Sequence, residues 1–555
     1  MTKKIRIAGP PGTGKTTKLV QIYYNHIVES KYSPADIIVI SHTNTAADHI
    51  RDKIYSDDSI QEYQERTGKE IFRLIKQSKE TLKENVSTIH KFCKDRVVGQ
   101  SFLIEDYEIL INIHELFNKH TYGKSFQSVD LLFKKHPFFK FMSMARDNGK
   151  SFLDYYRSLT YKEKEEYKYE PEELIELEKK YITFKTNEKI NDRARIILDF
   201  QDMVQKFSDN EETSEDVCKN IKILIVDEAQ DSSVIQRKAE AVMSKNVDYF
   251  YKAGDPDQSI FEFAGADPDS FHKEFAKPEI ELEQGHRCPK IINEYCKEII
   301  RPVWNHYGYS RIWKPRETKE GQIVEGEIFE MSDLKQDPFA LELENRILNT
   351  KENFIFTYRG NEPSTMISYL KEIGMPIKIP KNAKLKFKYP TIEIKNQRSF
   401  LELSKGENVS LAKIKTMLKS VNPEYLASDK NIEDVDRGSY NKKWLVEQKY
   451  LVPGVMNVND FQLINKINSV IESNYIRKIV NNNRDLEDKR IFLENIHTIK
   501  GKEFDNVVLD MTLTNEEEDF VKRRMAFVAC SRAKKTLWTI KSRTNITLNR
   551  RAYDA

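Results

Sequence analysis

The segment Gly9-Pro-Pro-Gly-Thr-Gly-Lys15-Thr16 constrains the fold of this chain more than any other feature. It matches the pattern G-x-x-x-x-G-K-[ST] and lies between an apolar run, Ile5–Ala8, and a helical stretch that starts near Lys15. Such glycines let backbone N–H groups turn towards phosphate oxygens, while the lysine supplies a point charge and the threonine hydroxyl can ligate Mg²⁺. The pattern predicts an α/β domain whose phosphate site comprises Gly9, Pro10, Pro11, Gly12, Thr13, Gly14, Lys15, Thr16 and Thr17.

Two adjacent carboxylates follow a second apolar run. Asp227 and Glu228 come directly after Ile223-Leu-Ile-Val, where a carboxylate is costly to bury without a cation. We expect Asp227, together with Thr16, to hold Mg²⁺ and Glu228 to orient or deprotonate the attacking water. Phosphoryl transfer needs this positioning and charge neutralisation more than covalent chemistry. A solvated strand end is the ordinary alternative for the pair, and the phosphate loop disfavours it.

Short β-branched runs recur along the chain, with helical patterns between most of them. They are typical of buried parallel strands, and each motif with chemical character begins at the end of one. The expected strands are Ile5–Ala8, Ile37–Ser41, Ile221–Val226, Tyr249–Ala253, Phe354–Tyr358, Asn506–Leu509 and Leu537–Ile540.

The composition is that of a large chain with no export signal. A length of 555 residues suggests several domains, and no apolar run is long enough to cross a membrane. Lysine and arginine number 90 against 87 acidic residues, so any basic groove must be local. The cysteines are scattered without a C-x-x-C pair, and no signal-peptide pattern is seen, which favours a reducing cytoplasm.

From Asp227-Glu-Ala-Gln onward the sequence resembles the superfamily-1 DNA helicases. The segment Gly254-Asp-Pro-Asp-Gln-Ser-Ile-Phe-Glu-Phe-Ala-Gly-Ala makes it similar to the UvrD/Rep branch. The remaining motifs follow in the order of the family. They are His42-Thr-Asn-Thr-Ala-Ala, Thr88-Ile-His, Gln284-Gly-His-Arg, Tyr358-Arg-Gly-Asn, His497-Thr-Ile-Lys-Gly-Lys-Glu-Phe-Asp and Arg523-Arg-Met-Ala-Phe-Val-Ala-Cys-Ser-Arg-Ala.

The resemblance implies two RecA-like P-loop domains with parallel sheets, each interrupted by an inserted subdomain. We place the inserts where the sequence becomes rich in lysine, glutamate and asparagine and loses its strand pattern. The first domain is expected at 1–98 and 191–277, with a mostly helical insert at 99–190. The second is expected at 278–377 and 491–555, with its insert at 378–490.

The resemblance also assigns roles around Mg²⁺-ATP, which would lie between the two halves. Gln258 would sense the γ-phosphate, and Arg287 and Arg532 would act as arginine fingers from the second half. Guanidinium suits this task because its charged planar fork matches phosphate oxygens. Glu503 would accept a ribose hydroxyl, and Gln230 would relay between the halves. Surface ion pairing is the ordinary alternative for either arginine.

Single-stranded DNA would lie across both halves in this family. A motor that moves along DNA needs contacts that do not depend on the base sequence, and aromatic stacking and contacts to the DNA backbone meet this need. The expected contacts are His42, Thr43, Asn44, Thr88, His90, Phe263, Tyr358, Arg359, Asn361 and His497, with Phe263 the best stacking candidate. A turn or capping role is the ordinary alternative for any one of them, because Thr and Asn favour such positions.

The chain departs from the family at several positions. Relatives usually carry an aromatic residue in place of His42, an arginine in place of Ala264 and a tyrosine in place of His286. We therefore expect weaker DNA binding and weaker base stacking in this chain. Relatives also read adenine through a glutamine upstream of the phosphate loop, and the segment before Gly9 has no room for it. We therefore expect broad nucleotide use, unless an insert or the segment after Arg532 supplies a substitute pocket. The chain ends soon after Arg532, so neither a long tail nor a nuclease domain is expected there.

These patterns predict a cytoplasmic, ATP-dependent DNA helicase and translocase that moves 3′→5′. Its cofactor would be Mg²⁺-ATP, and its partners single-stranded DNA, single/double-strand junctions and proteins of DNA replication or DNA repair. The alternative is an ATP-switched single-stranded DNA-binding protein that remodels protein–DNA complexes without unwinding. The sequence also leaves open that the protein moves along RNA. A P-loop kinase of small molecules is disfavoured by Gln258, Arg287 and the His497–Glu503 block.

Overall fold

The chain forms two compact units in the computed structural model. Unit 1 comprises Met1–Val324 with Asp519–Ser531, and unit 2 comprises Glu325–Glu518 with Arg532–Ala555. Unit 1 therefore ends later than the predicted boundary after 277, and the four-part division of the chain stays a prediction. The structure describes residues 2–29, 32–97, 102–103, 137–159, 164–165, 167, 169–187, 189–190, 193–194, 197–198, 202, 204–205, 207, 218–359, 363–378, 390–427, 435, 437–466, 469–482, 484, 490–510 and 520–540.

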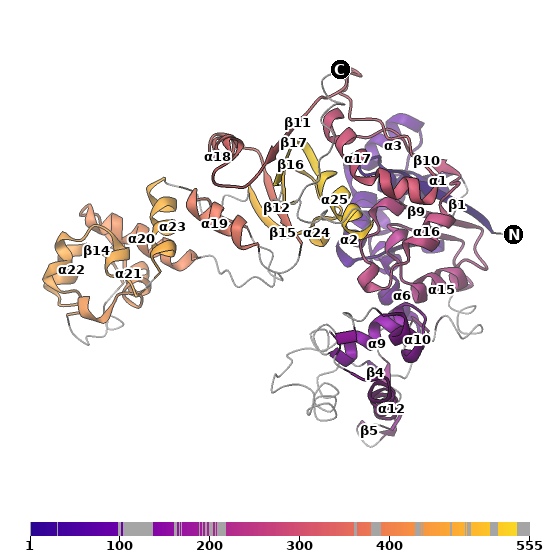
Figure 1. The fold of residues 1–555 in the computed structure, drawn as a ribbon, viewed down its shortest axis with the longest axis horizontal. Helices are drawn as coiled ribbons and strands as arrows, with labels where there is room; N and C mark the ends of the chain where they lie inside the picture. Colours follow the sequence, from indigo (N-terminus) through magenta and orange to yellow (C-terminus); the bar gives the residue numbers. More distant parts are fainter. Residues whose placement is uncertain are drawn as a thin grey trace. The chain divides into compact units, whose positions relative to one another are not determined.

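Unit 1 is built on a six-stranded parallel sheet in the order β10-β1-β9-β8-β2-β3 (Figure 1). The fully buried strands at Ile37–Ser41 and Ile223–Val226 are almost wholly apolar, as expected where helices cover both faces of a sheet. The strands are β1 (Lys3–Ala8), β2 (Ile37–Ser41), β3 (Val86–Thr88), β8 (Ile223–Val226), β9 (Tyr249–Gly254) and β10 (Ile280–Glu281).

Helices surround this sheet. They are α1 (Lys15–Val28), α2 (Asn44–Tyr55), α3 (Asp57–Thr67), α4 (Phe72–Gln77), α5 (Lys79–Asn85), α6 (Ile89–Val97), α15 (Val234–Met243), α16 (Pro268–Glu274), α17 (Lys290–Tyr307) and α25 (Phe520–Cys530). Helix α25 comes from far along the chain and packs on α17 within this unit. It therefore brings a late sequence motif to the first sheet.

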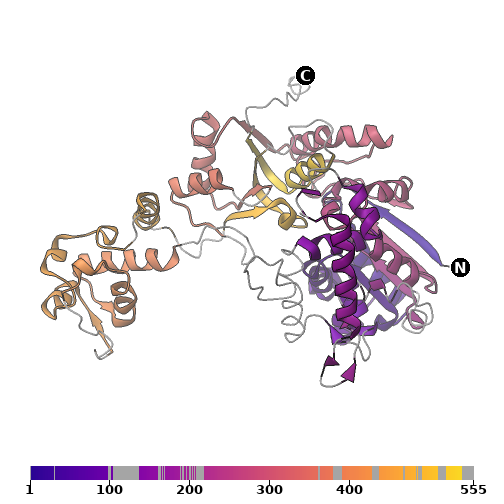
Figure 2. The same cartoon turned by 60° about the horizontal axis from the view of Figure 1, so that its bottom comes forward.

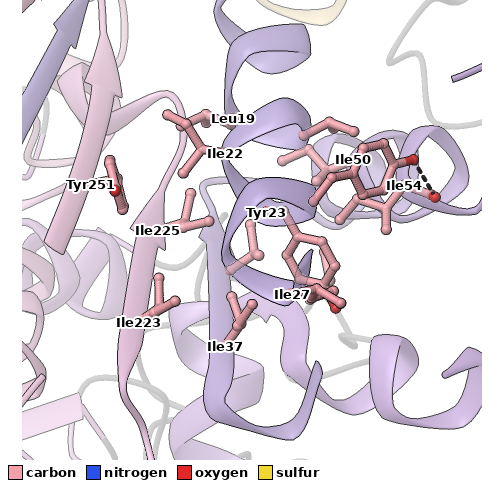
Figure 3. Close-up of a cluster of buried hydrophobic side chains, with 14 of the residues drawn as sticks. Leu19, Ile22, Tyr23, Ile27, Ile37, Ile50, Ile54, Ile223, Ile225 and Tyr251 are labelled. Carbon is pink, nitrogen blue, oxygen red and sulfur yellow. Dashed lines mark hydrogen bonds between the residues drawn. The ribbon is translucent and has the colours of Figure 1, made fainter. Parts of the chain in front are cut away.

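An apolar cluster holds α1 between the sheet and α2. Figure 3 shows Leu19, Ile22, Tyr23 and Ile27 of α1 among Ile37, Ile223 and Ile225 of the strands and Ile50 and Ile54 of α2. Each fully buried side chain of this kind contributes about 1.5–3 kcal/mol to stability. The cluster thus fixes the start of α1, and with it the phosphate loop, at the end of β1.

The described part of the predicted first insert is mainly helical. It contains α9 (Pro137–Asp147), α10 (Phe152–Ser158) and α12 (Pro171–Asn187), which Figure 1 shows grouped together. Short strands β4 (Phe102–Leu103), β5 (Lys189–Ile190), β6 (Arg193–Ala194) and β7 (Ile197–Leu198) accompany them. The helices share an aromatic core of their own that includes Phe138, Phe141 and Tyr181.

Unit 2 contains a five-stranded parallel sheet in the order β11-β17-β16-β12-β15. The strands are β11 (Glu327–Met331), β12 (Phe354–Tyr358), β15 (Ile491–Asn495), β16 (Phe504–Asp510) and β17 (Ala533–Ile540). Helices α18 (Pro338–Asn349), α19 (Ser364–Glu372) and α24 (Ile496–Ile499) belong to this sheet domain.

The described residues between 390 and 482 of unit 2 form a small helical group, which Figure 2 shows in orange. It contains α20 (Thr391–Ser404), α21 (Leu411–Leu418), α22 (Lys442–Glu447), α23 (Val470–Asn481) and the two-stranded pair β13 (Val409–Ser410) and β14 (Ser439–Tyr440). A separate apolar core lies under α20 to α22 and includes Phe400, Ile414 and Phe461.

The predicted fold class is confirmed, since both sheets are parallel and their connections are helical. Every predicted strand lies within or overlaps an observed one, and of the strands in the two large sheets β3, β10, β11 and β15 were not predicted. Strands β3 and β10 have three and two residues, too few for a recognisable period. Among the described residues, no helix is long and apolar enough to span a membrane.

Candidate nucleotide and DNA sites

The motifs of unit 1 all lie at one edge of its sheet. Because the strands are parallel, the loops that follow them meet at the carboxyl edge, where open α/β sheets bind ligands. The loops after β1, β8, β9 and β10 carry the residues expected at the nucleotide, and the loops after β2 and β3 carry expected DNA contacts. The loop after β9 carries Gln258 and also Phe263, so residues of both candidate sites lie along the same edge.

The phosphate loop leads from β1 directly into α1. Gly14 precedes the helix with φ 83°, and no side-chain hydrogen bond caps the helix start among the described residues, so its first N–H groups face outward as in phosphate-binding loops. Lys15 is only 8% exposed, and its Nζ donates to the carbonyl of Gly9 over 2.7 Å. The lysine is thus already held along the loop that it would serve.

Thr16 and Asp227, the two expected Mg²⁺ ligands, lie together. Oγ1 of Thr16 donates to Oδ2 of Asp227 over 3.0 Å, and the N–H of Glu228 donates to Oδ1 of Asp227 over 2.9 Å. Asp227 is 4% exposed, and its pKa is raised by burial and by the neighbouring Glu228, against the opposing effect of Lys15. These hard oxygen donors fit Mg²⁺, which usually binds one or two protein oxygens besides phosphate oxygens and water.

A buried chain of hydrogen bonds joins Glu228 to Gln258. Nε2 of Gln230 donates to Oε2 of Glu228 over 2.5 Å, and Oε1 of Gln230 accepts from the N–H of Asp255 over 3.0 Å. Asp255 in turn accepts from Nε2 of Gln258 over 2.6 Å through Oδ2. The residue expected to orient water and the residue expected to sense the γ-phosphate are therefore positioned by the same two side chains.

Glu228 has a backbone conformation that is uncommon for a residue with a side chain. Its φ of 52° and ψ of 38° place it in the left-handed region, two residues after the end of β8. Such a conformation costs energy and is found most often at functional sites. Here it turns the chain sharply enough for Ala229–Asp231 to form a 3-10 turn with Gln230 pointing back towards Glu228.

Arg287 lies against the phosphate loop inside unit 1. The N–H of His286 donates to the carbonyl of Gly12 over 2.9 Å. A Cβ on Gly12 would come within 2.7 Å of Cβ of Arg287, so only glycine permits this approach. Nη1 of Arg287 donates to the carbonyl of Ser531, at the end of α25, over 3.3 Å. Arg287 is thus packed with the nucleotide motifs of unit 1, whereas Arg532 belongs to unit 2.

The expected nucleotide residues of unit 2 do not follow their strands. Glu503 precedes β16 and Arg532 precedes β17, and the N–H of Phe504 donates to the carbonyl of Arg532 over 3.0 Å. Glu503 and Arg532 therefore lie at the amino edge of the second sheet, whereas the motif that contains Glu503 begins at His497, just after the carboxyl end of β15. Glu503 is exposed and Arg532 is 2% exposed.

Several expected DNA contacts of unit 1 also have local structural roles. Oγ1 of Thr43 caps α2 by accepting from the N–H of Ala46 over 3.1 Å, and Asn44 begins that helix as an exposed residue. Oγ1 of Thr88 accepts from the N–H of Lys91 over 3.3 Å. Burial lowers the pKa of His90 to about 4, so this side chain is neutral at physiological pH.

A row of aromatic rings lies at the same edge. The ring of His42 is 5.1 Å from that of Phe261, which is 5.7 Å from that of Phe263. Phe263 is 58% exposed and lies in the 3-10 turn Glu262–Ala264. An exposed ring at the end of a packed row is a suitable platform for a nucleic-acid base, since any base can stack on it.

In unit 2 the expected DNA contacts lie at the carboxyl edge. Tyr358 ends β12 and pairs with Asn495 at the end of β15, and Oδ1 of Asn495 accepts from the N–H of His497 over 3.0 Å. Tyr358 is 7% exposed with its ring in the apolar core, whereas Arg359 is exposed. Asn361 lies outside the described residues. The second sheet thus separates these residues from Glu503 and Arg532 at its opposite edge.

Sequence reasoning missed the structural importance of Asp255. This residue is fully buried, with an exposed fraction of 0%, and it connects Gln230 to Gln258. It follows strand β9 in the segment Gly254-Asp-Pro-Asp, as Asp227 follows β8. A carboxylate directly after an apolar run was therefore the signal that could have identified it.

Comparison with known proteins agrees with these motifs. The family model for the UvrD/REP helicase N-terminal domain matches residues 1–278, and that for the UvrD-like helicase C-terminal domain matches residues 490–540. The chain belongs to the UvrD/REP helicase family. The two parallel sheets are accordingly consistent with two RecA-like domains, and this UvrD-like chain has ATP-dependent DNA helicases among its homologues.

The similar curated proteins are distant relatives. The ATP-dependent DNA helicase Rep of Buchnera aphidicola is 24% identical over 476 residues, which cover 68% of this chain and 71% of that protein. A probable DNA helicase II homolog of Mycoplasma genitalium is 22% identical over 445 residues, covering 74% of this chain and 56% of that protein. A probable DNA helicase II homolog of Rickettsia conorii is 26% identical over 229 residues, only 34% of its length.

Proposed function

We propose that this member of the UvrD/REP family is an ATP-dependent DNA helicase that moves 3′→5′ on single-stranded DNA. The observation that carries the proposal is the arrangement at the carboxyl edge of unit 1. There the Thr16–Asp227 pair, the Glu228–Gln230–Asp255–Gln258 chain and the exposed ring of Phe263 share one edge of one sheet. A nucleotide switch and a base-stacking platform are thus built on the same loops.

The residues of this chain would divide the work of hydrolysis. Thr16 and Asp227 would hold Mg²⁺, which supplies charge neutralisation at the β- and γ-phosphates. Lys15 would leave the Gly9 carbonyl to bind phosphate oxygens, and Glu228 would orient the water or accept its proton. Gln258 would respond to the γ-phosphate through its amide, and loss of that phosphate would reach Glu228 through Asp255 and Gln230.

Arginines would complete the site, and ATP turnover would drive movement. Arg287 and Arg532 would stabilise charge on the phosphates in the transition state, and Glu503 would hold the ribose. Binding and hydrolysis would close and open the two RecA-like halves expected for the family, so that DNA-holding surfaces step along the strand. We place this activity in the cytoplasm, where the five buried, unlinked cysteines would stay reduced.

The test is strand displacement on duplexes with a single-stranded tail at one end only. The protein should release strands from 3′-tailed duplexes in the presence of Mg²⁺-ATP and leave 5′-tailed duplexes intact. Lys15→Ala protein serves as the control without turnover. Release from 5′-tailed duplexes alone would contradict the polarity. DNA-stimulated hydrolysis without release of any strand would instead favour an ATP-switched remodeller of protein–DNA complexes.

A further inference from the structure

Lys53 reaches the phosphate loop from the helix that carries two of the expected DNA contacts. It lies near the end of α2, which Thr43 caps at the opposite end. Its Nζ donates to Oγ1 of Thr17 over 2.6 Å. Lys53 is half-buried, so its stem is packed and its ammonium is held at one place.

The position of Thr17 shows which part of a nucleotide the ammonium would meet. Thr16 and Thr17 are successive residues in the first turn of α1, and successive helical side chains point about 100° apart. Thr16 contacts Asp227, the expected Mg²⁺ ligand that serves the β- and γ-phosphates. Thr17 therefore faces a different part of the phosphate chain from Thr16.

The neighbours of Gly14 support the same placement. A Cβ built on Gly14 would lie 3.9 Å from Oγ1 of Thr17 and 3.9 Å from Cδ2 of His286, which is exposed. The Thr17 hydroxyl, and with it the Lys53 ammonium, thus lies beside the last glycine of the loop. Backbone N–H groups of such a loop cradle the α- and β-phosphates. Glu228 and Gln258 are the residues expected at the γ-phosphate.

We propose that Lys53 is a phosphate-binding residue whose ammonium contacts the α- or β-phosphate of a bound nucleoside di- or triphosphate. An ammonium has three donors, so Lys53 can keep its bond to Thr17 and still donate to a phosphate oxygen. This contact does not involve the base. The inference rests on the proposed nucleotide site and extends it with a second lysine, one that sequence motifs do not identify.

The test measures nucleotide affinity in the full chain with Mg²⁺ present. Lys53→Met removes the charge and keeps the length, and it should weaken ATP and ADP binding equally, each by about tenfold, which corresponds to about 1.4 kcal/mol. Lys53→Arg, which restores the charge, should bind both nucleotides within about threefold of the original chain. These expectations follow from the strength of hydrogen bonds between charged groups.

Lys76 provides the matched control. Its Nζ donates to the carbonyl of Tyr55 over 2.6 Å and pairs with Asp57 over 2.6 Å, so it is another anchored lysine of unit 1. Lys76→Met should bind both nucleotides like the original chain. Lys53→Gln serves as a second neutral variant, and thermal melting of each protein separates a loss of binding from a loss of folding.

Three results would overturn the proposal. The first is a folded Lys53→Met or Lys53→Gln protein that binds both nucleotides normally, and the second is a loss confined to ATP, which would place the ammonium at the γ-phosphate. The third is an equal loss in Thr17→Val, which would make Lys53 only a support for the hydroxyl. The proposed function fails separately, if the unaltered chain does not bind ATP or if Lys15→Ala binds it normally.

Discussion

Gln230→Glu is the substitution that most directly tests how the hydrolytic residues are positioned. Gln230 is 1% exposed, donates to Glu228 through Nε2 and accepts from the N–H of Asp255 through Oε1. Glutamate has nearly the same shape and keeps the acceptor for Asp255. It replaces the donor that faces Glu228, and that also lies 3.5 Å from Oδ2 of Asp231, with a carboxylate oxygen.

The expected size of the effect follows from this contact. A hydrogen bond to a charged group contributes about 1.5–3 kcal/mol, and two like charges about 4 Å apart repel by about 4 kcal/mol at an effective dielectric constant of 20. Protonation of one carboxyl would relieve part of that repulsion and would also remove the base function of Glu228. We expect a net loss of about 3 kcal/mol in the transition state, a decrease in kcat of about a hundredfold.

The assay is steady-state ATP hydrolysis with saturating single-stranded DNA, together with the Kd for ATP. Gln230→Glu should lower kcat and leave the Kd within a few fold, because the phosphate contacts of Lys15 and Thr16 are unchanged. Gln236→Glu is the matched control. Gln236 is 8% exposed, and its Oε1 accepts from the N–H of Ser233 over 2.9 Å, a bond that glutamate can also accept. This control should hydrolyse ATP normally.

A kcat for Gln230→Glu within threefold of the original value would refute the reasoning. It would mean that Glu228 does not depend on Gln230 for its position, or that Glu228 is not the group that acts on water. A decrease of equal size in Gln236→Glu would show instead that any added charge near this part of the sheet disturbs the fold.

Three further predictions concern catalysis, nucleotide choice and stability. Lys15→Ala and Glu228→Gln should both abolish DNA-stimulated hydrolysis, but only Glu228→Gln should trap bound ATP in a filter-binding assay; near-normal turnover of Glu228→Gln would contradict its role. The exposed His286 stands beside the phosphate loop, where the family resemblance implies a tyrosine that stacks on adenine. We therefore expect kcat/KM for GTP, CTP and UTP to be within about a hundredfold of that for ATP, and a larger preference would contradict this. Burial and the charges of Arg524 and Arg311 lower the pKa of His272 to about 2, so the folded protein favours the neutral imidazole. Urea midpoints should therefore fall as pH drops below about 6.5, the unfolded pKa of histidine, and fall less in His272→Gln; an equal fall in both proteins would exclude His272 as the cause.

The arrangement of residues at the candidate phosphate site could be predicted from sequence because its motifs are local. Gly9 to Thr16 are contiguous, and Asp227 and Glu228 follow an apolar run that could only be a strand. Parallel strands bring the loops that follow them to one edge of the sheet, and this does not depend on the rest of the fold. The contact of Thr16 with Asp227 over 3.0 Å is the direct consequence.

Other contacts at the candidate site depend on tertiary packing, which a local sequence pattern cannot predict. The contact of Lys53 with Thr17 requires α2 to pack on α1, and the carbonyl that Arg287 reaches belongs to Ser531 at the end of α25. Arg532 lies at the amino end of β17, because the strand begins just after it. For Thr43 the sequence also allowed a helix-capping role. Its hydroxyl makes that capping hydrogen bond in the structure, and the bond does not require DNA.

Missed strands show the same limit at the level of the fold. β11, Glu327–Met331, mixes charged and apolar residues at the edge of its sheet, and its residues are mostly half-buried or exposed. An edge strand is covered less than a central one, so it need not be a continuous apolar run. β12 next to the centre of the same sheet is fully buried and was predicted with its observed bounds.

The central claim is that ATP hydrolysis by this chain is coupled to single-stranded DNA. The most direct measurement is the ATPase rate with single-stranded DNA, duplex DNA and single-stranded RNA in parallel, at equal nucleotide concentration and with Lys15→Ala as the blank. The account predicts strong stimulation by single-stranded DNA and much weaker stimulation by duplex DNA. A rate that none of these nucleic acids changes would contradict the claim, and stimulation by RNA alone would show that the track is RNA.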